Sequence, residues 1–181
     1  MRSRVLLAAV LALPALAGAA VVERVLAVVE GAPILLSEVE LIERLRGVTR
    51  EAALEAVIDE RLMFREASRL AQTALGAEEE ERAYRSLATL AGEGFSDAEL
   101  RRLARRQATI LRYVEFRFGA QVRVDDEAVR KEWESSHPSG PEMAAADADR
   151  MRELLAAKAL DERIEAWVAE LREGADIRYN P

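Results

Sequence analysis

The clearest hydrophobic pattern of the chain lies between residues 22 and 40 (VVERVLAVVEGAPILLSEVE). In residues 22–29 both alternating sets are largely apolar, which is typical of a strand covered on its two faces. Residues 30–33 (EGAP) are turn formers, and the apolar run resumes over 34–36 as a second short strand. Ser37 precedes Glu40 by three positions, which is the capping-box spacing. The segment therefore predicts strand, turn, strand and helix start.

The rest of the chain reads as a series of helices. The pattern predicts helices over 39–46, 50–74, 78–91, 97–118 and 126–134, with Thr49, Ser96 and Asp125 as caps of the second, fourth and fifth. Gly76 stands where a left-handed stop residue belongs. A loop at 92–94, an extended connector at 119–124 and a break at 135–141 (SSHPSGP) separate helices.

The apolar stripe changes sides near the C-terminus. Met151, Leu154 and Leu155 share one helix face, and Leu160, Ile164, Trp167, Val168 and Leu171 share the opposite one. One straight helix cannot bury both sets against a single core. We therefore expect a break near Leu160, with Asp161 as the new cap, and a terminal strand over 175–179 (ADIRY).

Two central helices differ in how much of their circumference is apolar. In the helix over 97–118, one stripe is apolar and the opposite side carries arginines; the stripe comprises Leu100, Leu103, Ala104, Ile110, Leu111, Val114 and Phe118. These arginines either pair with the glutamate-rich helix over 78–91 or surround an aromatic contact patch. The helix over 50–74 is apolar on most sides, so it is either central or half-exposed to an apolar partner.

The first twenty residues have the organisation of a cleavable signal peptide. Arg2 and Arg4 precede an apolar segment at 5–16 and a small-residue site at 17–19 (AGA). An uncleaved anchor is the rival interpretation, although the apolar run is short for a membrane span. The chain has no Cys, so it has neither a disulfide nor a lipid-bearing cysteine at the cleavage point. We expect a periplasmic protein without stable membrane insertion.

The mature chain, residues 21–181, has a length typical of one domain. The sequence has 26 basic and 33 acidic residues, and loss of Arg2 and Arg4 leaves a net charge of −9. Nucleic-acid binding uses clustered positive charge, so this balance argues against nucleic-acid partners.

Several segments together resemble the SurA-like periplasmic chaperones, relatives of the parvulin-type peptidyl-prolyl isomerases. They are residues 22–40, AVIDERLMFREASRLA, FSDAELRRLARRQATILRYVEFRFGAQVRVDDEAVRKEWE and KALDERIEAWVAELREGADIRYN. The resemblance implies a mainly α fold, a multi-helix SurA N-terminal-like chaperone domain whose first and last strands pair in a small β element.

One departure from the family bears on activity. Where isomerase members carry a parvulin domain, this chain has only a short linker at 135–149, which is too small and polar to form a core. Its single histidine, His137, lies in that linker and is expected to be a solvated loop residue. We expect no catalytic residues, no metal, no cofactor and no small-molecule substrate.

The leading hypothesis is an ATP-independent chaperone whose partners are unfolded or partly folded exported polypeptides, outer-membrane proteins among them by resemblance. Tyr113 and Phe116 are predicted to form a contact patch among arginines, and Met63, Phe64, Tyr84 and Phe95 are candidates for the same cradle. Two alternatives remain: a helical adaptor for one exported complex, and an isomerase-family protein with residual activity.

Overall fold

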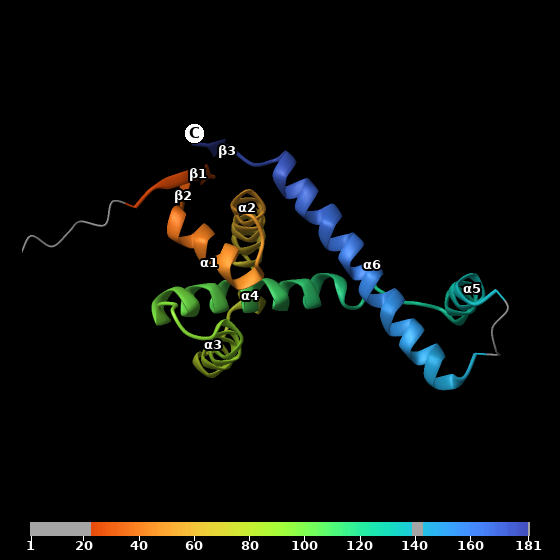
Figure 1. Ribbon diagram of the computed structural model, residues 1–181. Coiled ribbons are helices and arrows are strands. Elements are labelled where there is room, and N and C mark those ends of the chain that lie inside the picture. Colours follow the sequence, from red (N-terminus) through yellow and green to blue (C-terminus); the bar gives the residue numbers. More distant parts are fainter. Residues whose placement is uncertain (1–22, 139–142, 181) are drawn as a thin grey trace, which may run out of the picture.

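The computed structural model describes residues 23–138 and 143–180. These residues form a mainly helical fold with a small antiparallel sheet at one end (Figure 1). The elements are β1 (Val25–Val29), β2 (Ala32–Leu35), α1 (Leu36–Arg46), α2 (Arg50–Ala67), the 3₁₀ turn η1 (Ala71–Thr73), α3 (Ala77–Ala91), α4 (Asp97–Phe118), α5 (Asp126–Ser136), α6 (Ala145–Glu173) and β3 (Ile177–Tyr179). The predicted signal peptide, at 1–20, lies outside the described residues.

The first two strands form a tight hairpin. Glu30 and Gly31 have φ angles of 53° and 80°, the left-handed conformation that a two-residue hairpin turn of type I′ requires. The turn is shorter than the predicted 30–33, because Ala32 and Pro33 already pair with β1. Leu36, predicted to end the second strand, begins α1 instead.

The last strand pairs with the first, as the family resemblance implied. β1 is the central strand, and Val29 and Ala27 lie opposite Ile177 and Tyr179 of β3. Glu30 strengthens this junction, since its carboxylate accepts a hydrogen bond from the Asp176 N–H at 3.1 Å and pairs with a guanidinium of α2. The Asp176 hydrogen bond is the main reason why the pKa of Glu30 is lowered.

Three helix starts follow local hydrogen bonding, and one prediction about them is wrong. The carboxylate of Glu38 accepts from the Leu35 N–H at 3.3 Å, so the α1 start uses Glu38 and not the predicted Ser37–Glu40 pair. The predicted caps at Thr49 and Asp125 are confirmed: their side chains accept from the N–H groups of Ala52 at 3.3 Å and Ala128 at 2.8 Å. Ser96 precedes α4 without a side-chain capping bond.

The second helix ends earlier than predicted. α2 stops at Ala67, and the buried hydroxyl of Thr73 donates to the Ala67 and Leu70 carbonyls at 2.6 and 2.7 Å. These bonds satisfy carbonyls at the helix end and fold the chain into η1. Gly76, predicted as a left-handed stop, has a φ of −78° and instead precedes α3.

The C-terminal helix is continuous, so the predicted break near Leu160 is wrong. α6 runs from Ala145 to Glu173, and its two halves contact different partners. The first half packs against α5, where Arg152 pairs with Asp126 at 2.7 Å. The second half packs against α2 and α4. The two halves of one continuous helix thus have different neighbours, although Leu154 of the first apolar face remains exposed.

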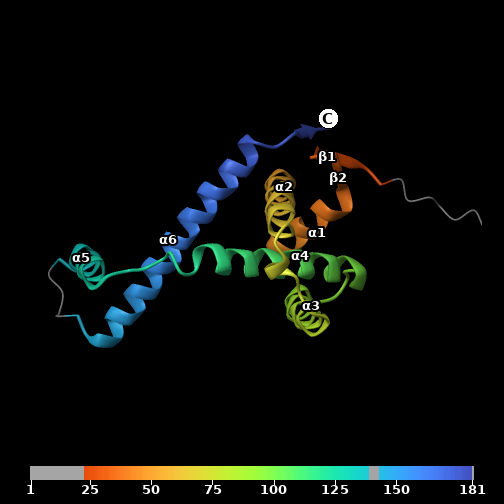
Figure 2. The same ribbon diagram turned by 180° about the vertical axis from the view of Figure 1, so that it is seen from behind.

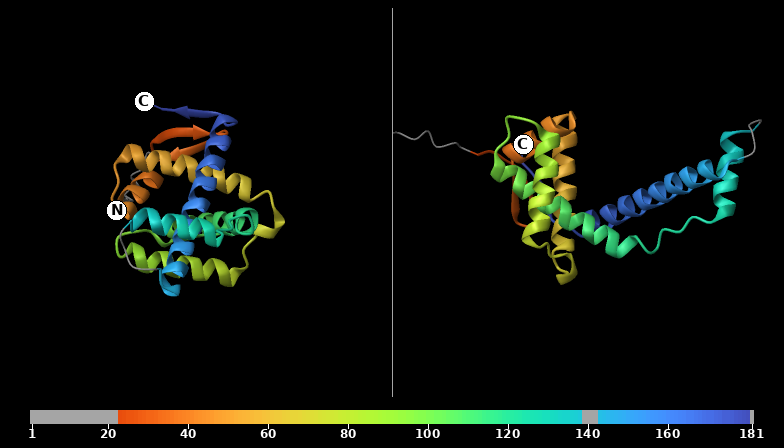
Figure 3. Two further views of the ribbon diagram at one scale, coloured as in Figure 1. Left: turned by 90° about the vertical axis from the view of Figure 1, so that its right-hand side faces the viewer. Right: turned by 90° about the horizontal axis from the view of Figure 1, so that it is seen from below.

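The core consists of two apolar clusters bridged by α4. The first cluster joins the sheet, α1, α2 and the start of α4; the second joins the end of α2, the second half of α4 and Trp167 of α6. Tyr113 stacks on Trp167 with 4.9 Å between ring centroids, and Phe118 lies against the same ring at 5.8 Å. From there, α5 and the first half of α6 project away from the body (Figures 2 and 3).

Trp167 should therefore account for much of the attachment of α6. Trp167→Ala is expected to lower the free energy of unfolding by about 3–5 kcal/mol, because it removes a buried indole and leaves a cavity. Leu154→Ala, on the same helix at a site 63% exposed, is the matched control and should change it by less than about 0.5 kcal/mol. Urea unfolding followed by circular dichroism measures both variants. Equal losses in the free energy of unfolding would contradict the attachment of α6 through Trp167.

Candidate functional site

An open groove of about 750 Å³ lies where α2, α4 and α6 meet. Its apolar lining comes from three helices: Ala56 and Met63 of α2, Ile110, Leu111 and Val114 of α4, and Ile164, Val168 and Ala169 of α6. Polar and charged side chains complete it: Arg46 of α1, Asp59 and Glu60 of α2, Gln107 of α4, and Glu165 and Arg172 of α6. We call this cavity the α2/α4/α6 groove. Its volume is in the range of protein ligand sites, and its shape follows from α6 crossing α4 obliquely (Figure 1).

Leu111 is the most exposed large apolar residue of the groove. It is 68% exposed, whereas Ile110 and Val114 beside it are 9% and 5% exposed. At about 100° per residue, position 111 lies about 20° from Leu100 and Phe118, within the apolar stripe of α4. The sequence therefore assigned Leu111 to the core, but the structure leaves it at the mouth of the groove.

An ion-paired cluster forms one rim of the groove. Arg172 of α6 donates to Asp59 at 2.5 Å and to Glu55 at 2.8 Å, both on α2, and the Tyr179 hydroxyl donates to Glu55 at 3.0 Å. Burial acts to lower the pKa of Arg172, but the hydrogen bonds that its guanidinium donates to the two carboxylates outweigh this effect and raise that pKa. Burial and the Glu55 contact raise the pKa of Tyr179. The cluster joins α6 and β3 to α2.

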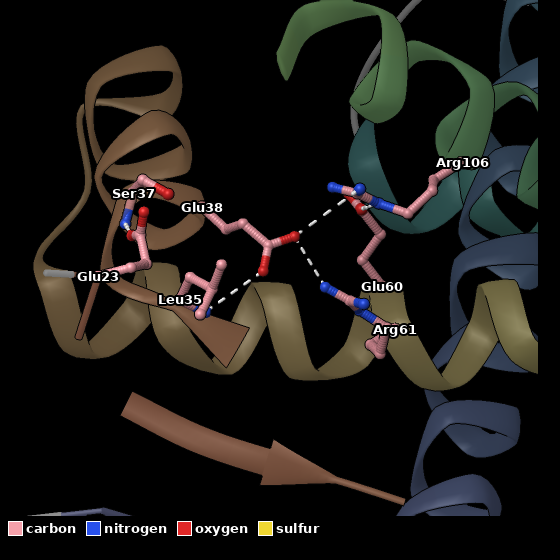
Figure 4. Close-up of polar contacts among 7 residues, drawn as sticks. All are labelled: Glu23, Leu35, Ser37, Glu38, Glu60, Arg61 and Arg106. Atoms are coloured by element: carbon pink, nitrogen blue, oxygen red, sulfur yellow. Dashed lines mark hydrogen bonds and ion pairs between the residues drawn. The ribbon is translucent and has the colours of Figure 1, made fainter. Parts of the chain in front are cut away.

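A second, more buried ion-pair network reaches the wall of the groove at Glu60, and Figure 4 shows its contacts. Glu60, which faces the groove and is 5% exposed, accepts from Nε of Arg106 at 2.5 Å. Glu38 accepts from Arg61 at 2.7 Å and lies 3.8 Å from Arg106. The two carboxylates and two guanidiniums balance in charge and connect α1, α2 and α4. On its other side this network lines a smaller cavity of about 490 Å³.

The predicted patch of Tyr113 and Phe116 is only half present. Phe116 is 61% exposed, but Tyr113 is 3% exposed and stacks on Trp167, so its placement in a contact surface is wrong. Three residues along α4 leave the two positions only about 60° apart around the helix, so stacking on Trp167, and not helix phase, distinguishes them. Tyr113 therefore belongs to the second apolar cluster.

The other four predicted residues divide between the two clusters. Met63 and Phe64 pack against the second cluster, and Met63 also lines the groove. Tyr84 and Phe95 pack against the first cluster, with arginines over their rings at 3.8 and 4.1 Å. The expected single cradle is thus not formed, and only Met63 of the six lies in the groove. Leu111, Ile164 and Val168 were missed because a sequence cannot show which stripe faces another helix and which faces an opening.

The arginine side of α4 is explained by ion pairs with α3. Arg101 and Arg105 lie 2.6 and 3.1 Å from Glu81 and Glu80, and Arg112 pairs with Glu79. The prediction that these arginines pair with the glutamate-rich helix is confirmed. The N–H of Gly76 and the guanidinium of Arg112 lower the pKa of Glu79, consistent with its place at the positive end of α3.

Other chemistry has little support in the described part of the chain. Within residues 23–138 and 143–180, no three acidic or histidine side chains are grouped so as to hold a metal ion. His137 is exposed and stacks on Trp133 with 3.9 Å between centroids. Among the helices that these ranges contain, none has the length and apolar character needed to cross a membrane.

Comparison with known proteins found neither a family model nor a curated protein that matches this chain. The groove and its ionic walls are therefore the main structural basis for a functional proposal.

Losing one partner of the Glu60–Arg106 ion pair should destabilise the fold more than losing both. Glu60→Ala is expected to lower the free energy of unfolding by about 3 kcal/mol, because it leaves the Arg106 guanidinium, only 14% exposed, without its closest carboxylate. The double variant Glu60→Leu/Arg106→Leu removes both charges and should lose less stability than Glu60→Ala alone. Urea unfolding of the three proteins measures this, and a double variant less stable than Glu60→Ala would disprove the pairing argument.

Proposed function

We propose that the protein is an ATP-independent chaperone that binds unfolded or partly folded exported polypeptides in the α2/α4/α6 groove. The observation that carries this proposal is a groove with an apolar lining that stays open to solvent, with Leu111 68% exposed at its mouth. A concave site with a mainly apolar lining and a few charged groups is the usual form of a binding site.

The composition of the groove suits clients of varied sequence. Aliphatic side chains and the flexible Met63 accept many apolar shapes, and binding energy comes from burying apolar area, about 25 cal/mol per Å². The walls are held by ion pairs that the client does not need to break, namely Asp59–Arg172 and Glu60–Arg106. The negative net charge of the protein, −7 over the whole sequence, favours solubility of the loaded complex.

The chain is proposed to be a SurA-like chaperone domain without the parvulin domain, acting in the periplasm after export. Two features support this proposal beyond the order of motifs in the sequence. The terminal strands pair around a helical body, and a helix containing Trp167 leads into the last strand. Only a short segment separates Ser136 of α5 from Ala145 of α6, where isomerase relatives carry their catalytic domain.

A groove variant tests the proposal against a matched surface change. Leu111→Glu should weaken client binding by about tenfold, because it places a charge where a leucine-sized apolar contact is made. Leu90→Glu, on α3 at a site 81% exposed and outside the groove, makes the same substitution and should have no effect. Light scattering measures how well each protein suppresses aggregation of several unrelated polypeptides diluted from urea, an outer-membrane β-barrel protein among them.

The same assay separates the chaperone from the alternative of a dedicated adaptor. Broad suppression near equimolar ratios supports the chaperone. Absence of aggregation suppression together with one stable partner supports the adaptor. Equal loss of aggregation suppression in Leu111→Glu and Leu90→Glu would contradict binding of polypeptides in the groove.

We further propose that the protein has no peptidyl-prolyl isomerase activity. The cis-to-trans conversion of a proline peptide should proceed at its uncatalysed rate, tens of seconds at 25 °C, in the presence of the protein. A protease-coupled assay measures the rate. Acceleration that scales with protein concentration would favour the alternative of residual isomerase activity, and loss of that acceleration in His137→Ala would implicate the single histidine.

A further inference from the structure

The outer edge of β3 carries main-chain groups that pair with nothing in the described chain. Glu30 donates to the Asp176 carbonyl and Asn180 donates to the Leu26 carbonyl, both at 2.8 Å. Since main-chain groups alternate sides along a strand, these bonds direct the N–H and C=O of Arg178 toward β1. The same groups of Ile177 and Tyr179 therefore point outward. In residues 23–138 and 143–180 no hydrogen bond reaches these four groups.

The opposite edge of the sheet is blocked. Val28 uses its main-chain groups to pair with β3, so Pro33, which lies opposite Val28 on β2, directs its own groups away from the sheet. Proline has no N–H to donate, and proline on an edge strand is a known means of preventing strand addition. Only one edge of the three-stranded sheet is thus competent to accept a strand, and it is the β3 edge.

The position of β3 leaves this edge accessible. β3 lies at the outer margin of the fold, with β1 on one side of it and, among the described residues, no other element beyond it (Figures 1 and 3). Tyr179 is 52% exposed, and Arg178 is exposed on the other face of the strand.

A second copy of this chain is a poor occupant of the edge. Antiparallel pairing of two β3 strands that uses all four outward groups sets Ile177 opposite Tyr179 and Arg178 opposite its own copy. That arrangement places two guanidiniums in a directly opposed pair, and like charges directly opposite each other are destabilising. A strand with a neutral or acidic residue at this position has no such conflict.

We propose that the β3 edge accepts an extended segment of an unfolded polypeptide as a fourth strand. This inference rests on the chaperone function proposed above, and it names the client conformation: a β-strand bound through its main chain. Main-chain hydrogen bonds do not depend on the client's sequence, whereas side-chain pockets do. With only two outward residues the edge is a weak site by itself. It is coupled to the groove, because Tyr179 contacts Glu55, which also binds Arg172 in the groove rim.

Amide hydrogen exchange in the intact protein tests the proposal directly. The protein is expressed as the full chain, and the probe is a short peptide of alternating Val and Thr residues. In the free protein the Ile177 and Tyr179 amides should exchange rapidly, and the peptide should slow both while leaving the Arg178 amide, already bonded to β1, nearly unchanged. The same samples are assayed for suppression of client aggregation.

Tyr179→Pro removes an outward N–H, and Tyr179→Ala is its control because both lose the phenol contact with Glu55. The proline variant should bind the peptide about fivefold more weakly than the alanine variant, as expected for one lost hydrogen bond. Equal affinity of the two variants would overturn the proposal.

The remaining outcomes separate the two proposals. Aggregation suppression without protection of Ile177 and Tyr179 removes the β3 edge as a site and leaves the groove function intact. Absence of both suppression and protection rejects the chaperone and the strand site together. Protection that grows with protein concentration in the absence of peptide assigns the edge to a second copy and overturns the client assignment.

Discussion

The antiparallel pairing of β3 with β1 is the contact on which the rest of the arrangement depends. It joins residues 177–179 to residues 27–29, at nearly opposite ends of the described chain. The pairing fixes one end of α6, and Trp167 fixes a second point on the same helix by stacking on Tyr113. Two attachment points set the angle at which α6 crosses α4. The groove is the space that this angle leaves between α2, α4 and α6. The pairing of β3 with β1 therefore also shapes the candidate site.

The charged residues keep this open arrangement in place without filling it. Arg172 binds both Asp59 and Glu55 at the rim, and Glu60 binds Arg106 in the wall. Each of these carboxylates is paired, so no uncompensated charge faces the apolar lining from these positions. An apolar surface can stay exposed in this protein because the helices around it are held by strand pairing, by Trp167 and by these ion pairs, and not by burial of the groove itself.

The sequence predicted some local features that a single residue decides, but not the α1 start, the missing cap bond of Ser96 or the conformation of Gly76. Thr49 and Asp125 accept the capping hydrogen bonds expected of them, and the helical character of the chain and the loop at 92–94 were predicted from periodicity and glycine. Features that depend on a distant neighbour were predicted less well. The break near Leu160 was inferred from two apolar faces on the assumption of one core, whereas α6 has a second partner in α5.

The site was the least predictable part for the same reason. Tyr113 and Phe116 look equivalent in the sequence, yet Trp167, more than fifty positions away, buries only the first. Leu111 belongs to an apolar stripe and is nevertheless exposed, because it lies at the open groove that α6 lines from the other side. Exposure of an apolar residue is decided by long-range packing, which neither periodicity nor composition contains.

Photo-crosslinking from single positions tests the central claim, that unfolded polypeptides bind in the groove, most directly. A photoreactive side chain replaces Leu111 in one protein and Leu90 in another, and each is mixed with defined polypeptides diluted from urea and with the same polypeptides folded. We expect crosslinks from position 111 to several unrelated unfolded polypeptides, few from position 90, and none to the folded forms. Equal crosslinking from both positions, or equal crosslinking of folded and unfolded forms, would contradict this claim.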